Sequence, residues 1–513
     1  MPDRSPRAAK SAADILKADT LARPFVLAAE RAPGHPALLV GGDALTYGDL
    51  LGQVRQAGAG VAALRRDGVP PRVALSLGNQ PELLALFFGI VAAGGVVGLL
   101  DPKWSAAQTD AALDTLRPDL HLTSGTAAGW IAAQPAGWAV PAVDPRTPFL
   151  IGFTSGTTGR PKAFIRDQGS WLATLAASRV EFGIRPGDVV LVPGPLTHGL
   201  GLYGAVEALS AGATVEVQPR FDAAAAADRL AGSGLTTLVV VPTMLVGILD
   251  AAERQGRRFP ALRRVVCSGA KLAPAVHDRL VALCPDVTVL EYYGASELSF
   301  VSLRSSREGA PADSVGRPFH GVDIDLRDDA GHPAEHGRPG TVWVRSRMLS
   351  NGYLGGTDGS GYRERDGWGT VGDYGWIDED GWLRLIGRAG DMVVSGGLNV
   401  YPAEVEAALR AHPAVAEAVV FGLPDPYWGD AVSAVVWWRG AVTATLAELR
   451  AWCRERLEAY KAPRRLFTAD DMPLTGSGKI ARADVREFAR SGLLASAGVV
   501  ADAAERPAAG KPS

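Results

Sequence analysis

The most constraining feature of this sequence is the alternation of short β-rich segments with longer, Ala-rich segments of helical pattern. Each of the β-rich segments is followed within about ten residues by a helical one. The clearest pairs are 72–77 with 81–93, 189–192 with 202–210, and 236–241 with 244–255. Strands and helices that alternate in this way predict an α/β fold in which helices are layered on largely parallel sheets.

From about residue 314 the composition and the pattern of segments change. Gly, Asp and Trp become frequent, and short strand-like segments are separated by turns. The segments 341–346 and 378–387 predict a β-rich subdomain. After residue 390 the pattern is compact and of mixed type. It predicts helices near 402–412 and 446–459 and strands at 415–421 and 431–438. We therefore place a domain boundary at 388–391, between domains 13–389 and 390–494, and expect disorder in 1–12 and in the Ala-, Gly- and Pro-rich end, 495–513.

An apolar run of 18 residues, 83–100, formally reaches the length of a transmembrane helix. Four glycines interrupt the run, two of them adjacent at 94–95, and an Asp-Pro pair ends it. The pattern favours a buried helix, a glycine turn and a buried strand over a membrane span.

Composition narrows the class of protein. The 513 residues carry 52 basic and 55 acidic side chains, a net charge of −3, without long blocks of one sign, so a nucleic-acid surface is not expected. Cys267, Cys284 and Cys453 are too few and too widely spaced for a disulfide framework or a zinc site. No apolar signal-peptide segment follows the first ten residues, and a cytoplasmic location is expected.

Residues 153–164 read FTSGTTGRPKAF and point most directly to chemistry. Gly, Pro and hydroxyl residues let the backbone bend tightly and expose successive N–H groups, which form concave sites for anions. The candidate phosphate-binding residues are Thr154, Ser155, Gly156, Thr157, Thr158, Gly159 and Lys162. The spacing does not fit a Walker A loop. A turn-rich surface loop is the alternative interpretation.

The order of residues in this loop resembles the phosphate-binding loop of adenylate-forming enzymes. That superfamily comprises acyl- and aryl-CoA synthetases, adenylation domains of peptide synthetases, and luciferases. The resemblance runs from about residue 25 to residue 490. It implies a large N-terminal domain of layered αβ subdomains plus a β-rich subdomain, followed by a small, mobile α+β C-terminal domain.

Two further segments resemble the parts of the family site that hold adenine and magnesium. They are EYYGASELS (291–299) and SGAKLA (268–273). The implied roles are Tyr293, Gly294, Gly269 and Ala270 at adenine, Ser296 at the α-phosphate, and Glu297 with Thr154 at Mg²⁺. Aromatic faces suit a purine and hard carboxylate oxygens suit Mg²⁺, so the residue types agree with these roles.

Three segments of the second half resemble the ribose motif, the thioester-forming loop and the lysine-bearing loop of the family. TVGDYGWIDEDGWLRLIGRAGD (370–391) implies that Asp373 and Arg388 bond ribose or phosphate. GGLNVYPAEVE (396–406) implies that Gly396 and Gly397 leave room for the pantetheine arm of coenzyme A. PLTGSGKIAR (473–482) implies that Lys479 is the catalytic lysine.

The acid-binding side is the least specific part of the resemblance. PLTHGLG (195–201) resembles the segment beside the acyl pocket, where His198 would approach the substrate carboxylate. The expected pocket walls are Trp171, His198, Leu202, Tyr203, Ser268 and Gly294. The segment lacks the early Asp with which peptide-synthetase domains bind an α-amino group, so a carboxylic acid without that group is expected.

The resemblance implies a two-step reaction that uses Mg²⁺, ATP and coenzyme A. A carboxylate attacks the α-phosphorus of ATP to give acyl-AMP and pyrophosphate, and a thiol then displaces AMP. An enzyme that loads a carrier protein, or one specialised for a single half-reaction, stays open as an alternative. A protein with a dead site is disfavoured, because Lys479, Glu297 and Asp373 are all present.

Two positions depart from the family pattern. Gly390 stands at the hinge, two residues after Arg388, where relatives usually carry Asp or Lys. Because Gly loosens the backbone, it would change the balance between the two domain arrangements. Arg166 and Asp167 stand where many relatives carry a His shortly after the phosphate loop.

Overall fold

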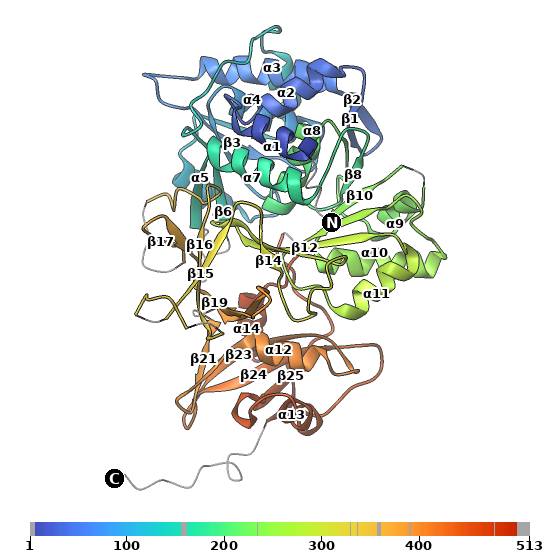
Figure 1. The fold of residues 1–513 in the computed structure, drawn as a ribbon, viewed down its shortest axis with the longest axis vertical. Helices are drawn as coiled ribbons and strands as arrows, with labels where there is room; N and C mark the ends of the chain where they lie inside the picture. Colours follow the sequence, from blue (N-terminus) through green and yellow to red (C-terminus); the bar gives the residue numbers. More distant parts are fainter. Residues whose placement is uncertain are drawn as a thin grey trace.

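The computed structural model describes residues 6–154, 162–232, 234–328, 330–335, 337–355, 361–388, 391–476 and 478–499. Within these residues the strands form four sheets. The N-terminal helices cover one end of an elongated molecule, a β-rich sheet lies in the middle, and a small α+β domain forms the other end (Figure 1).

The largest sheet has nine strands in the order β14-β13-β12-β11-β10-β8-β9-β1-β2. Its centre, from β12 to β1, is parallel, and antiparallel strands close both edges. The strands are β1 (Pro36–Val40), β2 (Asp43–Thr46), β8 (Val189–Val192), β9 (Thr214–Val217), β10 (Thr237–Val240), β11 (Arg264–Cys267), β12 (Thr288–Ala295), β13 (Ser299–Ser305) and β14 (Arg317–Pro318). The predicted parallel α/β layers are confirmed.

A second sheet of five strands has the order β5-β3-β4-β6-β7. Its strands are β3 (Arg72–Ser76), β4 (Val96–Leu99), β5 (Leu120–Thr123), β6 (Pro148–Thr154) and β7 (Lys162–Asp167). The long apolar run folds as predicted, into the buried helix α4 (Pro81–Ala92), a turn at Gly94 with φ +66°, and β4. Within the described residues, no helix is long and apolar enough to cross a membrane.

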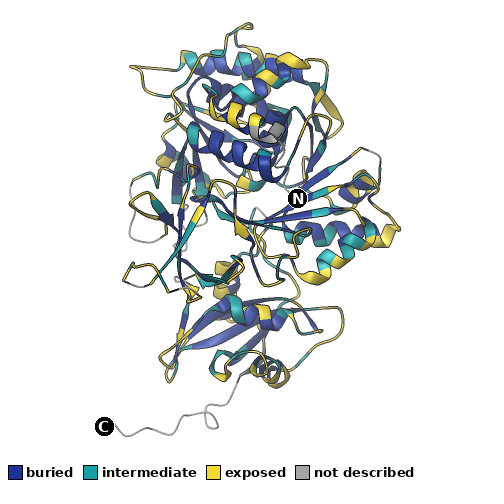
Figure 2. Cartoon of the chain, viewed as in Figure 1, coloured by how far each residue is buried: buried dark blue, intermediate teal, exposed yellow. Residues whose placement is uncertain are grey.

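Helices cover these two sheets on both faces. They are α1 (Pro6–Leu16), α2 (Arg23–Arg31), α3 (Tyr47–Ala63), α5 (Ala106–Leu116), α6 (Ala127–Ala132), α7 (Gln168–Glu181), α8 (Gly199–Ala211), α9 (Ala223–Ala231), α10 (Pro242–Gln255) and α11 (Pro274–Leu283). Most residues of α7 and α8 are buried, whereas outer helices such as α11 keep an exposed face (Figure 2). The two buried helices therefore belong to the core of the large domain.

The β-rich subdomain is a sheet of six strands, as predicted. The strands are β15 (Asp323–Arg327), β16 (Gly340–Arg345), β17 (Arg363–Arg365), β18 (Trp368–Thr370), β19 (Asp373–Ile377) and β20 (Leu383–Arg388). The antiparallel pairing of β19 with β20 sets Asp373 directly opposite Arg388. This register brings together two residues that lie 15 positions apart in the sequence.

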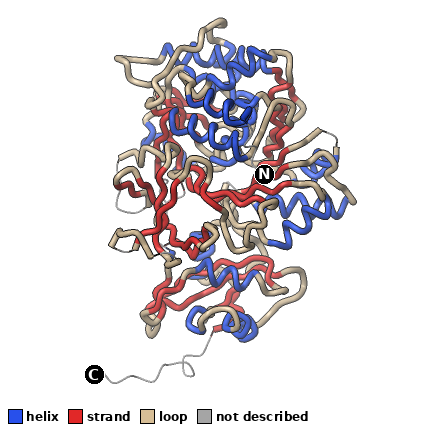
Figure 3. The backbone as a smooth tube through the Cα atoms, viewed as in Figure 1, coloured by secondary structure: helices blue, strands red, loops and turns tan. Residues whose placement is uncertain are grey.

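The C-terminal part folds as a separate sheet with helices on it, at the lower end of the molecule (Figure 3). Its elements are β21 (Val393–Ser395), β22 (Leu398–Val400), α12 (Pro402–Arg410), β23 (Val415–Asp425), β24 (Gly429–Trp438), α13 (Leu446–Arg454), the 3-10 helix Ala459–Lys461, β25 (Arg465–Thr468), α14 (Arg482–Arg490) and β26 (Ala495–Val499). Two clusters of buried apolar side chains give it a core of its own.

The expectation of disorder at the two ends is wrong for part of each. Residues 6–12 belong to α1, which packs against α7 and buries Ala12 and Ile15. Residues 495–499 form β26, which pairs antiparallel with β25. Contacts with α7 and pairing with β25 hold these segments, a tertiary effect that composition does not reveal. Residues 1–5 and 500–513 lie outside the described residues.

Candidate active site

The phosphate loop lies largely outside the described residues, which omit Ser155, Gly156, Thr157, Thr158 and Gly159. Its two ends are defined by the antiparallel pairing of β6 and β7. In that register Thr154 stands opposite Lys162, so the loop connects neighbouring strands at one edge of the five-stranded sheet. The roles assigned to these residues stay predictions.

Three predicted nucleotide-binding residues meet at the edge of the β-rich subdomain. The Tyr293 hydroxyl donates a hydrogen bond to the Asp373 carboxylate, and Arg388 Nε donates to Asp373 Oδ1 at 2.8 Å. Burial, reinforced by the Asp373 charge, raises the pKa of Tyr293. Burial alone would lower the pKa of Arg388, but the same carboxylate raises it. Asp373 therefore couples the aromatic ring to the guanidinium.

The turn that carries Ser296 and Glu297 is held from several sides. Tyr353 donates a hydrogen bond to Glu297 Oε1 at 2.6 Å, and Arg166 NH2 donates to the Ser296 carbonyl oxygen at 2.7 Å. A side chain at Gly294 would collide with the carbonyl of Ser299, which explains the glycine there. The turn is thus tied to β7 and to the segment after β16.

Arg166, the departure noted in the sequence, is fully enclosed. Its NH1 group donates to the Met348 carbonyl oxygen, while burial lowers its pKa to about 10 and the charge of Glu297 opposes that shift. A buried cation beside Glu297 adds positive charge to the side of the site where phosphate and metal are expected. The sequence marked this residue as unusual but gave no role for it.

The turn that is expected to lie over adenine contacts Lys479, the predicted catalytic lysine. Ser268 Oγ donates to the Tyr292 carbonyl oxygen at 2.9 Å, and Gly269 has a φ of +100°. A Cβ atom at Gly269 would stand 2.7 Å from Lys479 Cε. The absence of a side chain at this position lets the lysine approach.

Lys479 reaches this place from the C-terminal domain, on a loop that docks against the large domain. Thr243 Oγ1 at the start of α10 donates to the Gly478 carbonyl oxygen at 2.5 Å. Within the loop, Thr475 N donates to the Lys479 carbonyl oxygen at 2.6 Å. Burial, together with the nearby charge of Arg388, lowers the pKa of Lys479. The lysine, the adenine turn and the Asp373 cluster therefore form one site.

His198 is paired with a residue that the sequence did not single out. Its Nε2 atom lies 2.9 Å from Asp101 Oδ2, and Asp101 Oδ1 accepts a hydrogen bond from Lys103 N at 2.9 Å. Burial acts to raise the pKa of Asp101, but the bond to His198 and the backbone bond prevail and lower it. Asp101 follows β4, and its place at the carboxyl edge of a parallel sheet was the available signal.

Two of the predicted acyl-pocket residues, Trp171 and Tyr203, belong to an aromatic cluster between α7, α8 and the strands β12 and β13. The rings of Trp171 and Tyr203 lie 5.3 Å apart, and those of Tyr203 and Phe300 lie 5.2 Å apart. Tyr203 also bonds Ser178 through its hydroxyl at 2.7 Å. Trp171, Leu202 and Tyr203 are buried. Phe300, which the sequence did not single out, belongs to the same cluster.

The chain matches the AMP-binding enzyme family over residues 25–354 and the AMP-binding enzyme C-terminal domain over residues 404–479. The chain belongs to the AMP-binding enzymes. It is 35% identical over 486 residues to the uncharacterized acyl–CoA ligase YhfT of Bacillus subtilis, across 91% of this chain and 98% of that protein. A feruloyl-CoA synthase of Amycolatopsis sp. is 31% identical over 480 residues, across 89% and 96% of the two chains.

Among solved structures, the amide bond synthetase McbA from Marinactinospora thermotolerans superposes with a TM-score of 0.80 at 27% identity. The match covers 91% of this chain and 99% of that chain. The predicted superfamily, the fold with its small C-terminal α+β domain, and an adenylating ligase of the acid–thiol type are confirmed at the level of the family.

The residues of this AMP-binding enzyme fit a magnesium ion that is shared with phosphate. Within the described residues, no group of three or more His, Cys, Asp or Glu side chains could hold a metal alone. Glu297 offers a carboxylate of which Oε1 already accepts from Tyr353. One carboxylate plus phosphate oxygens is the donor set that Mg²⁺ commonly takes in nucleotide sites.

The predicted pantetheine residues occupy the tight turn between β21 and β22. Gly396 and Gly397 have φ values of +61° and +80°, which L side chains rarely adopt. A Cβ atom at Gly396 would also stand 2.8 Å from the Trp428 ring. Both glycines are required by this turn, and their role in making room for pantetheine stays a prediction. Gly390, the predicted hinge, lies outside the described residues.

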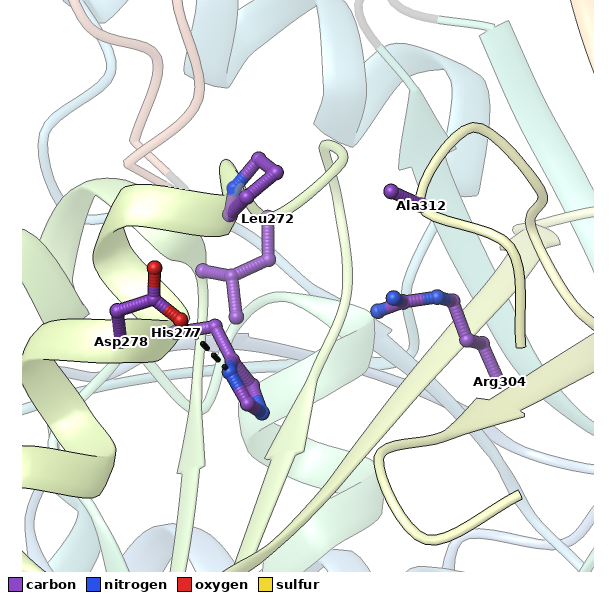
Figure 4. Close-up of a pocket in the computed structure, with 6 residues that line it drawn as sticks. Leu272, His277, Asp278, Arg304 and Ala312 are labelled. Atoms are coloured by element: carbon purple, nitrogen blue, oxygen red, sulfur yellow. Dashed lines mark ion pairs between the residues drawn. The ribbon is translucent and has the colours of Figure 1, made fainter. Parts of the chain in front are cut away.

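A small pocket lies apart from this site, between α11 and β13. Leu272, His277 and Asp278 line one side and Arg304 lines the other, where it reaches toward Leu272 (Figure 4). None of these residues was assigned a role, and Arg304 is engaged with Glu291 at 3.5 Å. This pocket is not the candidate active site.

Proposed function

We propose that this enzyme is an ATP-dependent acyl- or aryl-CoA synthetase. It would activate a carboxylic acid as acyl-AMP with release of pyrophosphate and then transfer the acyl group to the thiol of coenzyme A. The observation that best supports the proposal is the insertion of Lys479 from the C-terminal domain beside Gly269 and near Arg388. An ammonium group held at a nucleotide site is the group that a reaction between two anions requires.

The nucleotide would lie between the Tyr293 ring and the turn at Gly269 and Ala270. Asp373 would accept hydrogen bonds from the ribose hydroxyls, since a carboxylate has about four acceptor positions and only two are used by Tyr293 and Arg388. The loop 154–162 would surround the phosphates with backbone N–H groups and the Lys162 ammonium.

In the first step, the acid and the α-phosphate repel each other unless positive charge lies between them. Lys479 would provide that charge to both groups, and Arg388 would hold the ribose side in place. Glu297, with Thr154, would hold the Mg²⁺ ion, which supplies further neutralisation of phosphate charge when bound. Ser296 would donate its hydroxyl hydrogen to an α-phosphate oxygen.

The second step needs a different arrangement of the C-terminal domain. In the closed arrangement the Lys479 loop lies against the large domain, whereas Gly396 contacts Trp428 of its own domain. We infer that residues 390–494 rotate as a unit about Gly390, so that the glycine turn lines the passage for the pantetheine thiol.

For the acid, we favour a compact aryl group without an α-amino substituent. Trp171 and Tyr203, two of the expected pocket walls, pack edge to face, and Tyr203 packs in the same way on Phe300. Aromatic side chains bind aromatic ligands through offset and edge contacts. The feruloyl-CoA synthase among the relatives acts, by its name, on such an acid.

A panel of aryl, branched and medium-chain acids with Mg·ATP tests the proposal when pyrophosphate and thioester are followed separately, with and without coenzyme A. We expect both products from at least one aryl acid. Pyrophosphate without CoA thioester would favour a carrier protein as the acceptor. Thioester only from supplied acyl-AMP would indicate a specialist for the second half-reaction. No product from any acid, or from acyl-AMP, would contradict the proposal.

A further inference from the structure

The loop that carries Lys479 also contacts the large domain at a second place, which includes His198 of the predicted acid-binding side. A Cβ atom built on Gly476 would overlap Asp101 Oδ2 and would stand 2.9 Å from His198 Nε2. The backbone of the loop therefore lies directly on the paired Asp101 and His198 side chains. No other residue type can occupy position 476 without displacing one of them.

The surface that receives Gly476 is rigid rather than adaptable. Asp101 is a short side chain, and both of its oxygens are engaged, one by Lys103 N and one by His198. Its side chain is only 6% exposed. His198 precedes α8 as its N-cap residue, so its backbone is fixed by the helix. A new methyl group on the loop could not be accommodated by moving a flexible chain end.

The conformation of Gly476 does not itself require glycine. Gly478, two residues further on, has a φ of +80°, whereas Gly476 is not in the left-handed region. An alanine at position 476 would therefore cost little wherever the loop is away from the large domain. The demand for glycine arises only when the loop is docked.

We propose that the Asp101–His198 pair is the docking surface for the lysine loop, and that the missing side chain at position 476 selects the arrangement that performs adenylation. Thr243 is the second anchor, through its hydrogen bond to the Gly478 carbonyl oxygen. These residues act by placing Lys479 and are positioning residues. The inference rests on the proposed two-step function and predicts that the two steps respond differently to changes at this contact.

The test compares Gly476→Ala with wild type in two assays that use the best acid from the panel. Pyrophosphate formation from acid and Mg·ATP should fall by about 10- to 100-fold, the consequence of a steric cost of a few kcal/mol in one arrangement only. Thioester formation from supplied acyl-AMP and coenzyme A should change less than about twofold. Gly125→Ala is the matched control, because Gly125 has open space around it and no positive φ.

A double-mutant cycle identifies the contact that causes the loss. In an Asp101→Ala background, Gly476→Ala should reduce pyrophosphate formation much less than it does in wild type, because the colliding carboxylate is gone. An equal reduction in both backgrounds would overturn the proposal, as would an equal loss of both half-reactions. Thr243→Val gives a second route if Gly476→Ala fails to fold. It should lower pyrophosphate formation by about threefold to tenfold and leave thioester formation unchanged.

The outcomes also separate this inference from the proposed function. If wild type forms neither pyrophosphate nor thioester, the function is wrong whatever the variants do. If wild type forms both and Gly476→Ala forms both at wild-type rates, the function stands and the docking role is wrong.

Discussion

At the scale of single residues, the site depends on a few charged and polar side chains that lie next to one another. Asp373 accepts hydrogen bonds from Tyr293 and Arg388. The pKa of Lys479 is lowered mainly by desolvation, and the charge of Arg388 lowers it further. Asp373 is buried, and in a low-dielectric surrounding interactions between charges are stronger than in water. Single substitutions should therefore have large and specific effects.

Lys479→Ala should abolish pyrophosphate formation and leave thioester formation from supplied acyl-AMP largely intact. The loss in the first step should be about 10²–10³-fold or more, because the ammonium acts where charge develops. Stopped assays of the two half-reactions measure this split, with Lys17→Ala, an exposed lysine on the surface, as the control. If adenylation survives in Lys479→Ala, the role given to this lysine is wrong.

Asp373→Asn should raise the KM for ATP by about 10-fold or more, since a neutral amide no longer balances Arg388 and accepts fewer hydrogen bonds from ribose. The KM for the acid should change little. Initial-rate measurements at varied ATP check this. Asp378→Asn is a suitable comparison, because Asp378 also pairs with an arginine, Arg384, on the same sheet. An unchanged KM for ATP would contradict the ribose role.

At the scale of elements, the helices α7 and α8 bury a polar cluster beside the acyl pocket. Glu207 on α8 is enclosed near Arg179 of α7 and Arg264 of β11, and burial raises its pKa to about 7 against the opposing effect of these cations. Burial likewise lowers the pKa of Arg179. Desolvation disfavours the ionised form of Glu207 in the core, so the stability of the packing between the two helices should depend on pH.

Glu207 has a higher pKa in the folded than in the unfolded chain, so the folded protein binds more protons between the ordinary glutamate value and about pH 7. The free energy of unfolding should therefore fall as pH rises through this window, by on the order of 3 kcal/mol. Glu207→Gln should lose this dependence. Urea unfolding at pH 5 and pH 8 measures the change in the free energy of unfolding with pH. The control is Glu30→Gln, which replaces an exposed glutamate. The same slope in Glu207→Gln and wild type would refute the assignment.

The elements themselves were largely predictable, because periodicity and turn residues act locally. The run 83–100 folds as α4, a glycine turn and β4, as expected. The strand 189–192 has the predicted bounds, and the helix expected at 402–412 is observed as α12. The termini were mispredicted, since α1 and β26 are stabilised by contacts with α7 and β25 that composition cannot indicate.

At the scale of the whole molecule, the C-terminal domain is closed on the large domain. α12 packs against β20, and the rings of Tyr374 and Tyr401 stack at 5.4 Å across the two domains. The lysine loop docks at Thr243 and at the Asp101–His198 pair. This closure brings Lys479 against Gly269 and near Arg388, where the pKa of its amine is lowered.

The closure predicts a pH dependence that only the first step should show. The Lys479 ammonium is present below the pKa of the docked amine and is lost as pH rises through it, at a value below the ordinary 10.5. Pyrophosphate formation should therefore decline on an alkaline limb that begins below the usual lysine range. Thioester formation from acyl-AMP should lack that limb. Rate profiles of the two half-reactions, measured side by side, check this, and identical alkaline limbs would contradict it.

The sequence by itself determined the family, the order of elements and the residue types of the site, because glycine-rich loops, a carboxylate at a strand start and a lysine after two glycines are local patterns. Only the tertiary structure decided which residues meet. Asp101 pairs with His198, and Gly476 rests on both, because three chain segments from different parts of the fold converge there. Such contacts depend on how layers pack, and no spacing along the chain encodes them.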